Sequence, residues 1–224
     1  MANRKIKIQD FLSNVPLFSV LEPAELDAIA LGTTEMQVRR GEIVFQRGEP
    51  CLGLHVLIYG QIKLSVVSSP GNEKVVKIIR AGDSFGEALM FMGKNYIVTA
   101  QALEDCLVLH VSRNVINAEL AKSQNLTFNM LKGLSQRLYG LMEDVESYSL
   151  RSGAQRVIGY LLKHDHCENG ETITLSTSKA IIASRLNITP EHFSRILLDL
   201  STHGLIKVKG KEITILDMQG LIDF

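Results

Sequence analysis

Residues 176–200 read STSKAIIASRLNITPEHFSRILLDL, and this stretch decides the fold of the C-terminal part of the chain. The first helix has apolar residues on one side: Ile181, Ile182 and Leu186. It ends at Asn187, and Thr189 then caps a second helix, because a Thr hydroxyl readily accepts from a backbone N–H. Pro190 follows at the first helical position, where no N–H is needed. Two helices joined by so short a turn predict a helix-turn-helix.

The second helix divides into a buried and an exposed face. Four apolar residues are expected to face the core: Phe193, Ile196, Leu197 and Leu200. Five polar residues are expected to face outward: Glu191, His192, Ser194, Arg195 and Asp199. Because the outward residues of its first turns are polar and short, this helix suits the major groove of DNA.

A basic hairpin follows the second helix. Gly204 ends that helix, and Leu205–Ile215 form the wing of a winged helix-turn-helix. Three lysines at every second position are expected to share one face and to contact phosphates: Lys207, Lys209 and Lys211. Between Ser178 and Lys211 there are six cations, Lys179 among them, and two anions, which leaves an excess of four positive charges. A helical hairpin without a DNA role is the alternative, but the ordered set of signals favours DNA binding.

The composition of the 224 residues is that of an ordinary globular protein, with 46% apolar residues, 21% charged residues and no net charge. Zero net charge argues against a chain that coats nucleic acid along its whole surface. No apolar run approaches the roughly 20 residues of a membrane span. No apolar segment follows the basic start, so we expect a cytoplasmic protein with no membrane partner. Cys51, Cys106 and Cys167 are scattered, which predicts reduced thiols and no iron–sulfur cluster.

Short β-rich runs separated by turn residues fill the segment from Glu35 to Val111. The runs are 43–45, 54–59, 62–67, 75–79 and 106–111. Turns at these intervals predict an antiparallel jelly roll or small barrel. Residues 8–29 ahead of it predict short amphipathic helices. The expected fold class is therefore α+β, with an N-terminal β-barrel domain at residues 1–111.

From Ser112 the pattern becomes helical, and apolar residues later alternate three and four apart without a break: Leu131, Leu134, Leu138, Leu141, Val145 and Tyr148. This register predicts a coiled-coil seam and thus a parallel homodimer. The alternative is a helix laid on its own domain, which usually carries a wider apolar stripe. Ser149–Gly153 is expected to break the helix into a hinge. Residues 112–149 then form a helical linker and dimerisation helix, and residues 150–224 the winged helix-turn-helix domain.

Two short motifs, Pro190–Arg195 (PEHFSR) and Phe85–Ala88 (FGEA), indicate a family. The first resembles the E-x-x-S-R recognition signature of Fnr-type regulators, and the second resembles the G-E segment of a cyclic-nucleotide-binding-type barrel. With the heptad helix between them, the chain resembles the Crp/Fnr superfamily of transcription regulators from about Phe11 to Leu216. The resemblance implies a sensory barrel with a small effector, a homodimer and RNA polymerase as a partner, with activation as the expected effect.

The resemblance also implies roles for side chains of the second helix. Glu191 would accept from a cytosine amino group, Ser194 would contact a thymine, and Arg195 would reach guanine N7 and O6 and a phosphate. Thr189 and His192 join them in the expected contact set. The implied target is an inverted repeat of the TTGAT…ATCAA type, with half-sites roughly 34 Å apart.

The barrel lacks one residue that cyclic-AMP-binding relatives use. In those relatives a Glu holds the ribose and an Arg neutralises the cyclic phosphate, and Glu87 matches the former. Tyr96 or Ile97 stands where the Arg is expected, and Lys94 lies two or three positions away. Without the bidentate guanidinium the phosphate has no matching partner, so we do not expect cyclic AMP to bind.

Residues 87–92 (EALMFM) and 95–102 (NYIVTAQA) resemble the nitric-oxide-responsive branch related to dissimilatory nitrate respiration regulators. This resemblance implies nitric oxide sensing through haem b in the barrel. The expected effector pocket consists of Glu87, Met90, Phe91, Met92, Tyr96 and Ile97. Met90, Phe91 and Met92 would give a soft apolar lining for a porphyrin. Plain core packing between helix and barrel is the alternative.

Haem needs an axial ligand. The candidates are His55, His110, Met90 and Met92, and Cys51 and Tyr96 are no better supported. A regulator that senses another small molecule, such as a cyclic nucleotide or organic ligand, or redox state without haem, remains the alternative.

An enzyme is the competing class, since jelly-roll barrels can hold catalytic metals. Such sites need several inward histidines, whereas His55 and His110 are expected to stand alone. His164–Cys167 (HDHC) has a metal-like composition but no distant partner ligands, so a solvated loop is favoured. We therefore expect that the protein is not an enzyme. The expected mechanism is allosteric: an effector moves Gly86–Met92 against the helix Leu131–Tyr148, which turns the DNA-binding domains about the hinge.

Overall fold

The computed structural model describes residues 8–67, 73–162 and 168–224, without the side chains of residues 147–150. The chain divides into two compact units, Met1–Tyr139 and Gly140–Phe224. Each unit has its own hydrophobic core, and the boundary between the units falls within one helix, α5 (Gln124–Leu150), which adds Leu126 and Met130 to the first core. Among the described helices, none combines the length and the apolarity needed to cross a membrane.

The first unit is a barrel with helices at both ends of its sequence. In chain order its elements are α1 (Ile8–Ser13), α2 (Pro23–Leu31), β1 (Thr33–Val38), β2 (Ile43–Phe45), β3 (Gly53–Tyr59), β4 (Gln61–Val67), β5 (Glu73–Arg80), β6 (Ser84–Phe85), α3 (Glu87–Met92), β7 (Thr99–Ala102), β8 (Cys106–Ser112), α4 (Arg113–Leu120) and the first half of α5.

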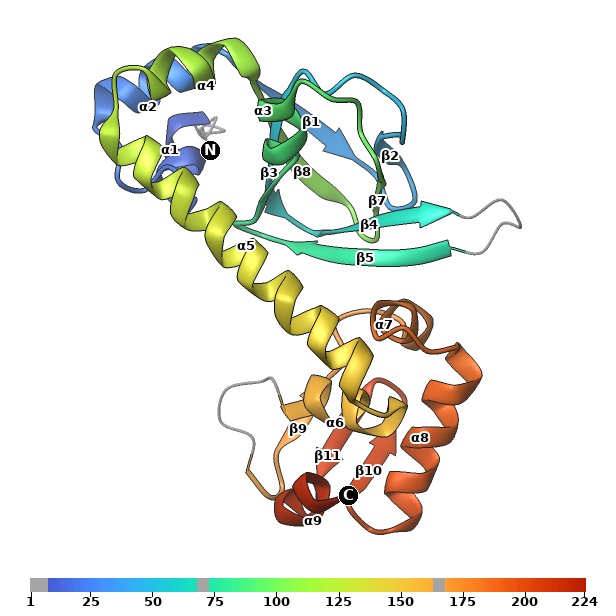
Figure 1. Cartoon of the computed structure of the whole chain (residues 1–224). Coiled ribbons are helices and arrows are strands. Elements are labelled where there is room, and N and C mark those ends of the chain that lie inside the picture. Colours follow the sequence, from blue (N-terminus) through green and yellow to red (C-terminus); the bar gives the residue numbers. More distant parts are fainter. Residues whose placement is uncertain (1–7, 68–72, 163–167) are drawn as a thin grey trace, which may run out of the picture. The chain divides into compact units, whose positions relative to one another are not determined.

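Two antiparallel sheets form the barrel, with strand orders β1-β8-β3-β6 and β2-β7-β4-β5 (Figure 1). Neighbouring strands come from distant parts of the chain, as the register of Gly53 opposite Ser112 illustrates. The predicted jelly-roll barrel is therefore confirmed. The predicted runs match β2, β3, β4, β5 and β8, whereas β1, β6 and β7 lie outside them, because these strands are short or polar.

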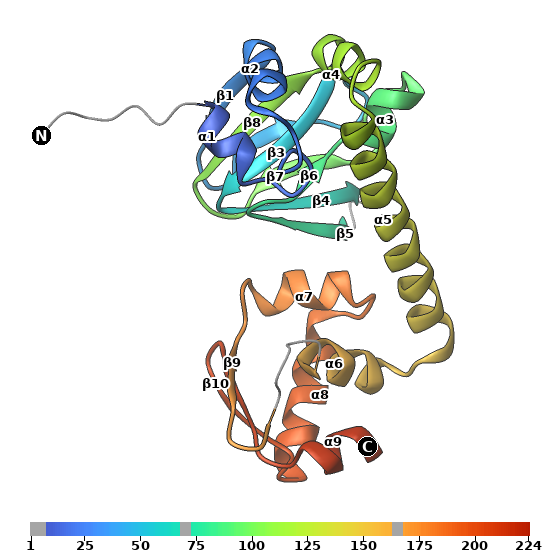
Figure 2. The same cartoon turned by 90° about the vertical axis from the view of Figure 1, so that its left-hand side faces the viewer.

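The helices α1, α2 and α4 pack together beside the barrel (Figure 2). Helix α2 contacts α4 and β1, and α4 also contacts β3 and β8. One apolar residue of each helix is fully buried and extends the barrel core: Leu12, Ile29 and Ile116. Helix α2 starts with a capping box, in which the Glu25 carboxylate accepts from the Glu22 backbone N–H at 2.8 Å.

The helical pattern after Ser112 forms two helices rather than one. The chain turns at residues 121–123, and Ser123 accepts from the Leu126 backbone N–H at 3.2 Å to start α5. Leu126 and Met130 anchor this start in the barrel core. At the other end α5 continues to Leu150.

The break after α5 falls within the expected segment Ser149–Gly153 and is shorter than that segment. Because α5 runs to Leu150 and α6 begins at Gly153, only Arg151 and Ser152 lie between the two helices. Within α5, Gly133 and Gly140 have no atoms of other elements near the place where a Cβ would lie.

The second unit is a winged helix-turn-helix. Its elements are the end of α5, α6 (Gly153–Leu162), β9 (Thr172–Thr174), α7 (Lys179–Arg185), α8 (Pro190–Thr202), β10 (Ile206–Lys209), β11 (Glu212–Ile215) and α9 (Met218–Asp223). The antiparallel sheet has the order β10-β11-β9, so β9 adds a third strand to the predicted wing hairpin (Figure 1). The four apolar residues predicted to face the core of this unit from α8 are all buried: Phe193, Ile196, Leu197 and Leu200.

Candidate functional site

The turn between α7 and α8 has the geometry that the sequence predicts. Ser178 Oγ accepts from the Ile181 N–H at 3.4 Å, and Thr189 Oγ1 accepts from the His192 N–H at 3.2 Å, so both helices are capped. Asn187 has a φ of 59° and is, within the described ranges, the one non-glycine residue with positive φ. Asn tolerates this left-handed conformation better than most residues, and it lets the chain reverse between the helices.

Arg156 of α6 stabilises this turn by hydrogen bonds to two of its carbonyl oxygens. Its Nη1 donates to the carbonyl oxygen of Leu186 at 2.9 Å and to that of Asn187 at 3.4 Å. These carbonyls follow the end of α7, where the helix dipole favours a cation. The sequence carried no signal for this contact, because Arg156 lies about thirty residues before the turn.

The exposed face of α8 presents three residues of the expected recognition set. Glu191, Ser194 and Arg195 are exposed, and in the described part of the chain their side chains form no hydrogen bond or ion pair. An exposed carboxylate, hydroxyl and guanidinium on the first two turns of a capped helix are groups that can pair with base edges. Their assignment to particular bases stays a prediction.

His192 lies differently from the expectation that it faces outward. It is half-buried, and a Cβ placed on Gly153 would come within 3.0 Å of its Cε1 atom. The imidazole therefore packs beside α6, because position 192 lies on the same side of α8 as the buried Ile196, one turn later. The side chain of His192 therefore does not face outward, as its predicted contact with DNA would require.

The lysines of the wing also need a correction. Lys207 and Lys209 are exposed on one face of β10, as predicted. Lys211 lies in the turn after Gly210 and outside both strands, so the strand alternation does not set its direction. Lys179, the first residue of α7, is half-buried.

One cation of the positive segment is neutralised within the second unit. Arg185, in the last turn of α7, forms an ion pair with Asp144 of α5, with 2.8 Å between Nη2 and Oδ2. The two side chains are 27% and 26% exposed. The local excess of positive charge near the helix-turn-helix is therefore smaller than the sequence count suggests.

The residues expected to form an effector pocket separate into two groups. Met90 and Tyr96 are buried in the barrel core, whereas Phe91, Met92 and Ile97 are 43%, 55% and 60% exposed. Met90, Phe91 and Met92 do not all face the barrel core, because successive residues of α3 point about 100° apart, and their common pocket stays a prediction. Met92 is thus turned away from the barrel interior.

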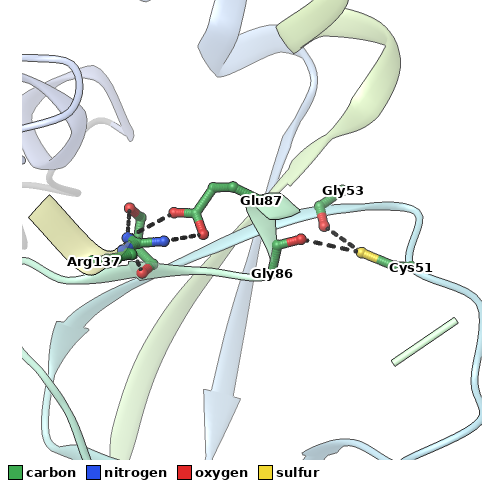
Figure 3. Close-up of polar contacts among 6 residues, drawn as sticks. Cys51, Gly53, Gly86, Glu87 and Arg137 are labelled. Carbon is green, nitrogen blue, oxygen red and sulfur yellow. Dashed lines mark hydrogen bonds and ion pairs between the residues drawn. The ribbon is translucent and has the colours of Figure 1, made fainter. Parts of the chain in front are cut away.

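Glu87 is the buried acid of the barrel. It begins α3, is 3% exposed, and forms an ion pair with Arg137 of α5 (Figure 3). In the heptad pattern Arg137 falls outside the apolar seam, and nothing local in the sequence indicates a partner 50 positions earlier. The carboxylate that nucleotide-binding relatives are expected to offer to a ribose is here bound by the chain itself.

His55 and His110 do not stand alone, contrary to expectation. They are directly opposite each other on β3 and β8, with 5.0 Å between ring centroids. Burial and the neighbouring His110 lower the pKa of His55 to about 3, and burial lowers the pKa of His110. Nδ1 of the buried His55 has no hydrogen-bond partner among the described residues.

Aromatic rings surround His55. Its ring centroid lies 5.3 Å from Phe45 and 5.1 Å from Phe85, and Phe45 stacks on Tyr96 at 3.6 Å. Burial raises the pKa of Tyr96, as does the hydrogen bond it shares with Cys51. Phe45, Phe85 and Tyr96 belong to the buried core of the barrel.

The described residues contain no group of three or more His, Cys, Asp or Glu side chains that could hold a metal ion. Cys51 and Cys106 are free and buried. His164–Cys167, favoured as a solvated loop, and Cys167 with it, lie outside the described residues.

Comparisons with known proteins follow the division into two units. Residues 35–123 match the cyclic nucleotide-binding domain family, and residues 155–224 match the Crp-like helix-turn-helix domain family. The chain is 27% identical over 212 residues to the transcriptional regulator flp of Lacticaseibacillus casei, covering 94% of this chain and 95% of flp.

Two solved structures extend this similarity. DNR from Pseudomonas aeruginosa is 32% identical, with both chains covered completely and a TM-score of 0.53. FixK2 from Bradyrhizobium japonicum is 22% identical, with a TM-score of 0.73 over 85% of this chain and 96% of FixK2, which supports the fold.

A jelly-roll unit and a winged helix-turn-helix, joined by a long helix, define a DNA-binding transcription regulator. The chain belongs to the Crp/Fnr family, which consists of such regulators and not of enzymes. The resemblance to the DNR branch that residues 87–102 suggested is confirmed.

Proposed function

We propose that this DNA-binding regulator acts as a cytoplasmic homodimer on an inverted repeat of the TTGAT…ATCAA type, where it activates transcription with RNA polymerase. An effector in the barrel controls it by moving α3 against α5. The effector favours the DNA-competent arrangement because it binds that arrangement more tightly.

One observation carries the DNA half of the proposal: Glu191, Ser194 and Arg195 are exposed together on the first two turns of α8. Their side chains form no bonds with other described residues, so binding to bases does not first break contacts within the chain. Lys207 and Lys209 on the wing supply cations for phosphates. We assign base reading to α8 and backbone contacts to the wing.

The second half of the repeat calls for a second copy of the chain. On α5, Leu131, Leu138, Leu141 and Val145 are between 55% and 64% exposed, although they are apolar. Leu134 belongs to the same seam and is half-buried, while the side chain of Tyr148 lies outside the described set. An exposed apolar seam with heptad spacing supports a coiled-coil dimer.

Arg195→Ala tests the assignment of base reading. We expect binding to the TTGAT…ATCAA duplex to weaken by about 1–3 kcal/mol per half-site, because a bidentate contact with guanine is lost. Binding to a scrambled duplex should weaken less, because only the phosphate contact of Arg195 is lost there. Fluorescence anisotropy with both duplexes at one salt concentration measures the difference.

Lys207→Ala is the control for Arg195→Ala. Removal of a phosphate contact should weaken both duplexes equally and lower the slope of log K against log salt by about 1. If Arg195→Ala shows this same uniform loss, Arg195 contacts only phosphate and the proposed half-site is wrong.

The proposed effector is nitric oxide, acting through a b-type haem as the sequence resemblance implies. Similarity along the whole of DNR supports the branch. A neutral, buried imidazole with an unpartnered nitrogen, such as His55, has the chemistry of an iron ligand. Haem supplies the iron that binds nitric oxide.

The side chains as described do not fit a haem inside the barrel. Phe45 and Tyr96 stack at 3.6 Å and Phe85 lies beside His55, so their rings occupy the space that a porphyrin needs. Met90 is buried in the core and Met92 points outward. Haem binding in the barrel requires these rings to separate.

Spectroscopy of purified protein reconstituted with haem tests this effector. We expect a sharp Soret band that shifts on addition of nitric oxide, and a change in DNA affinity with it. His55→Ala should weaken haem binding, whereas Met92→Ala, at an exposed position, should not. Loosely bound haem with unchanged DNA affinity would favour the alternative, a small molecule or redox signal sensed without haem.

A further inference from the structure

The buried acid of the barrel and one arginine of α5 form a bidentate ion pair. Arg137 Nη1 lies 2.5 Å from Glu87 Oε2, and Arg137 Nη2 lies 3.0 Å from Glu87 Oε1 (Figure 3). Glu87 is 3% exposed, and the Arg137 side chain is 32% exposed. Two parallel charge-assisted bonds fix the orientation of both groups.

Arg137 also reaches the strand that precedes α3. Its Nη2 donates to the carbonyl oxygen of Ser84 at 2.6 Å and to Ser84 Oγ at 2.9 Å. The guanidinium therefore spans the turn from β6 into α3. Of the two cations in α5, Lys132 is exposed and has no described partner, so only Arg137 provides this connection.

The turn held by Arg137 is also fixed from the barrel interior. Gly86 has a φ of 94°, a conformation that favours glycine, and its carbonyl oxygen accepts from Cys51 Sγ at 3.5 Å. Figure 3 shows these contacts side by side, from Cys51 through Gly86 and Glu87 to Arg137. A movement of α3 would therefore displace the groups to which Arg137 is bonded.

The spacing of residues on α5 gives this ion pair a particular role. Met130 and Arg137 are seven residues apart and lie on one face, which is committed to the barrel. Leu131 and Leu138, each the next residue along the helix, remain 59% and 62% exposed. The contacts of Met130 and Arg137 thus set the rotation of α5 about its own axis, and with it the direction in which the apolar seam faces.

The barrel is closed to an effector in this arrangement. Arg137 binds the carboxylate of Glu87, and Tyr96, one of the two residues that stand where the resemblance implies a phosphate-binding Arg, is buried and stacked on Phe45. Neither Glu87 nor Tyr96 is therefore free to bind an effector in this arrangement. A buried ion pair is also all-or-none, since loss of one partner leaves an uncompensated buried charge.

We propose that the Glu87–Arg137 ion pair is a latch that holds α5 in its effector-free rotation, and that effector binding opens it. Arg137 is then a positioning residue for DNA binding. The inference rests on the proposed function, because its consequence is read out at the inverted repeat. Weakening the latch should raise DNA affinity without any effector, since it removes a contact that stabilises the competing state.

The test uses the full-length protein without added effector, the TTGAT…ATCAA duplex and a scrambled duplex. Glu87→Gln with Arg137→Gln replaces the ion pair by neutral amides and leaves no unpaired buried charge. We expect this double variant to bind the repeat roughly tenfold more tightly than the wild type, within the usual range of allosteric coupling. Amide hydrogen exchange in α3 and in residues 130–139 should become faster.

Two further variants guard against a purely structural effect. Arg137→Lys keeps the charge beside Glu87 but loses the bidentate fork, so a smaller gain in affinity is expected from a protein that still folds. Lys132→Gln removes the other cation of α5 and should change neither DNA affinity nor hydrogen exchange.

Two results would overturn the latch: faster exchange with DNA affinity unchanged or lowered, or exchange that does not change at all. Failure of the proposed function looks different, because the wild type itself would then fail to prefer the repeat over the scrambled duplex.

Discussion

Replacing Leu138 and Leu141 with glutamate is expected to give a folded monomer that has lost specific binding to the inverted repeat. Both side chains are more than half exposed in the single chain, at 62% and 55%, so the substitutions remove little intramolecular packing. In a coiled-coil seam the same carboxylates would be buried opposite their copies, which is strongly unfavourable. A monomer can engage only one half-site, and we expect affinity to fall at least about 100-fold, towards non-specific binding.

Sedimentation measures the oligomeric state of the variant, and fluorescence anisotropy measures its affinity for the repeat. Lys132→Glu with Gln136→Glu adds two carboxylates at exposed positions of α5 outside the seam, and this control should remain dimeric and bind the repeat. A Leu138→Glu/Leu141→Glu protein that stays dimeric would show that the seam lies elsewhere. A monomer that binds the repeat as tightly as the wild type would refute the two-fold mode of binding.

Phe193→Ala is expected to destabilise the second unit by about 3–5 kcal/mol. Phe193 is fully buried at the centre of the core formed by α6, α8 and the wing. The free energy of unfolding of a small domain is about 5–15 kcal/mol, so most of the stability of this unit would be lost. Calorimetry should show the transition of the second unit at much lower temperature and the transition of the barrel unchanged.

Leu198→Ala on the same helix is the control, because Leu198 is 69% exposed and its truncation should change stability by less than about 0.5 kcal/mol. Equal shifts for the two variants would contradict the assignment of this core. A shift of the barrel transition with Phe193→Ala would show that the two units do not unfold independently.

Local signals in the sequence predict the helix-turn-helix closely. Thr189 and Pro190 start α8 where expected, since capping and the first helical turn depend on residues within a few positions. The apolar residues of α8 are buried as predicted, because the helical period alone decides which of them share a face. The β-rich runs predict most barrel strands, because strand composition and turn residues are also local signals.

Contacts between distant residues could not be predicted in this way. Arg137 reads as an outer residue of α5, yet it pairs with Glu87, 50 positions earlier. His55 and His110 meet only through the register of β3 and β8. Hydrophobicity at Met90, Phe91 and Met92 indicates an apolar segment, but the rotation of α3 decides which side chain enters the core.

The two glycines inside α5 have a consequence for the whole regulator. Gly133 and Gly140 meet no neighbouring element that would require the absence of a side chain, and each makes the helix about 1 kcal/mol less favourable than alanine would. Helicity along this segment thus depends on external support from Met130, from the ion pairs of Arg137 and Asp144, and from a second copy. A change at any of these contacts alters the free energy of forming the helix. A conformational change in the barrel can therefore raise or lower the helical order of α5.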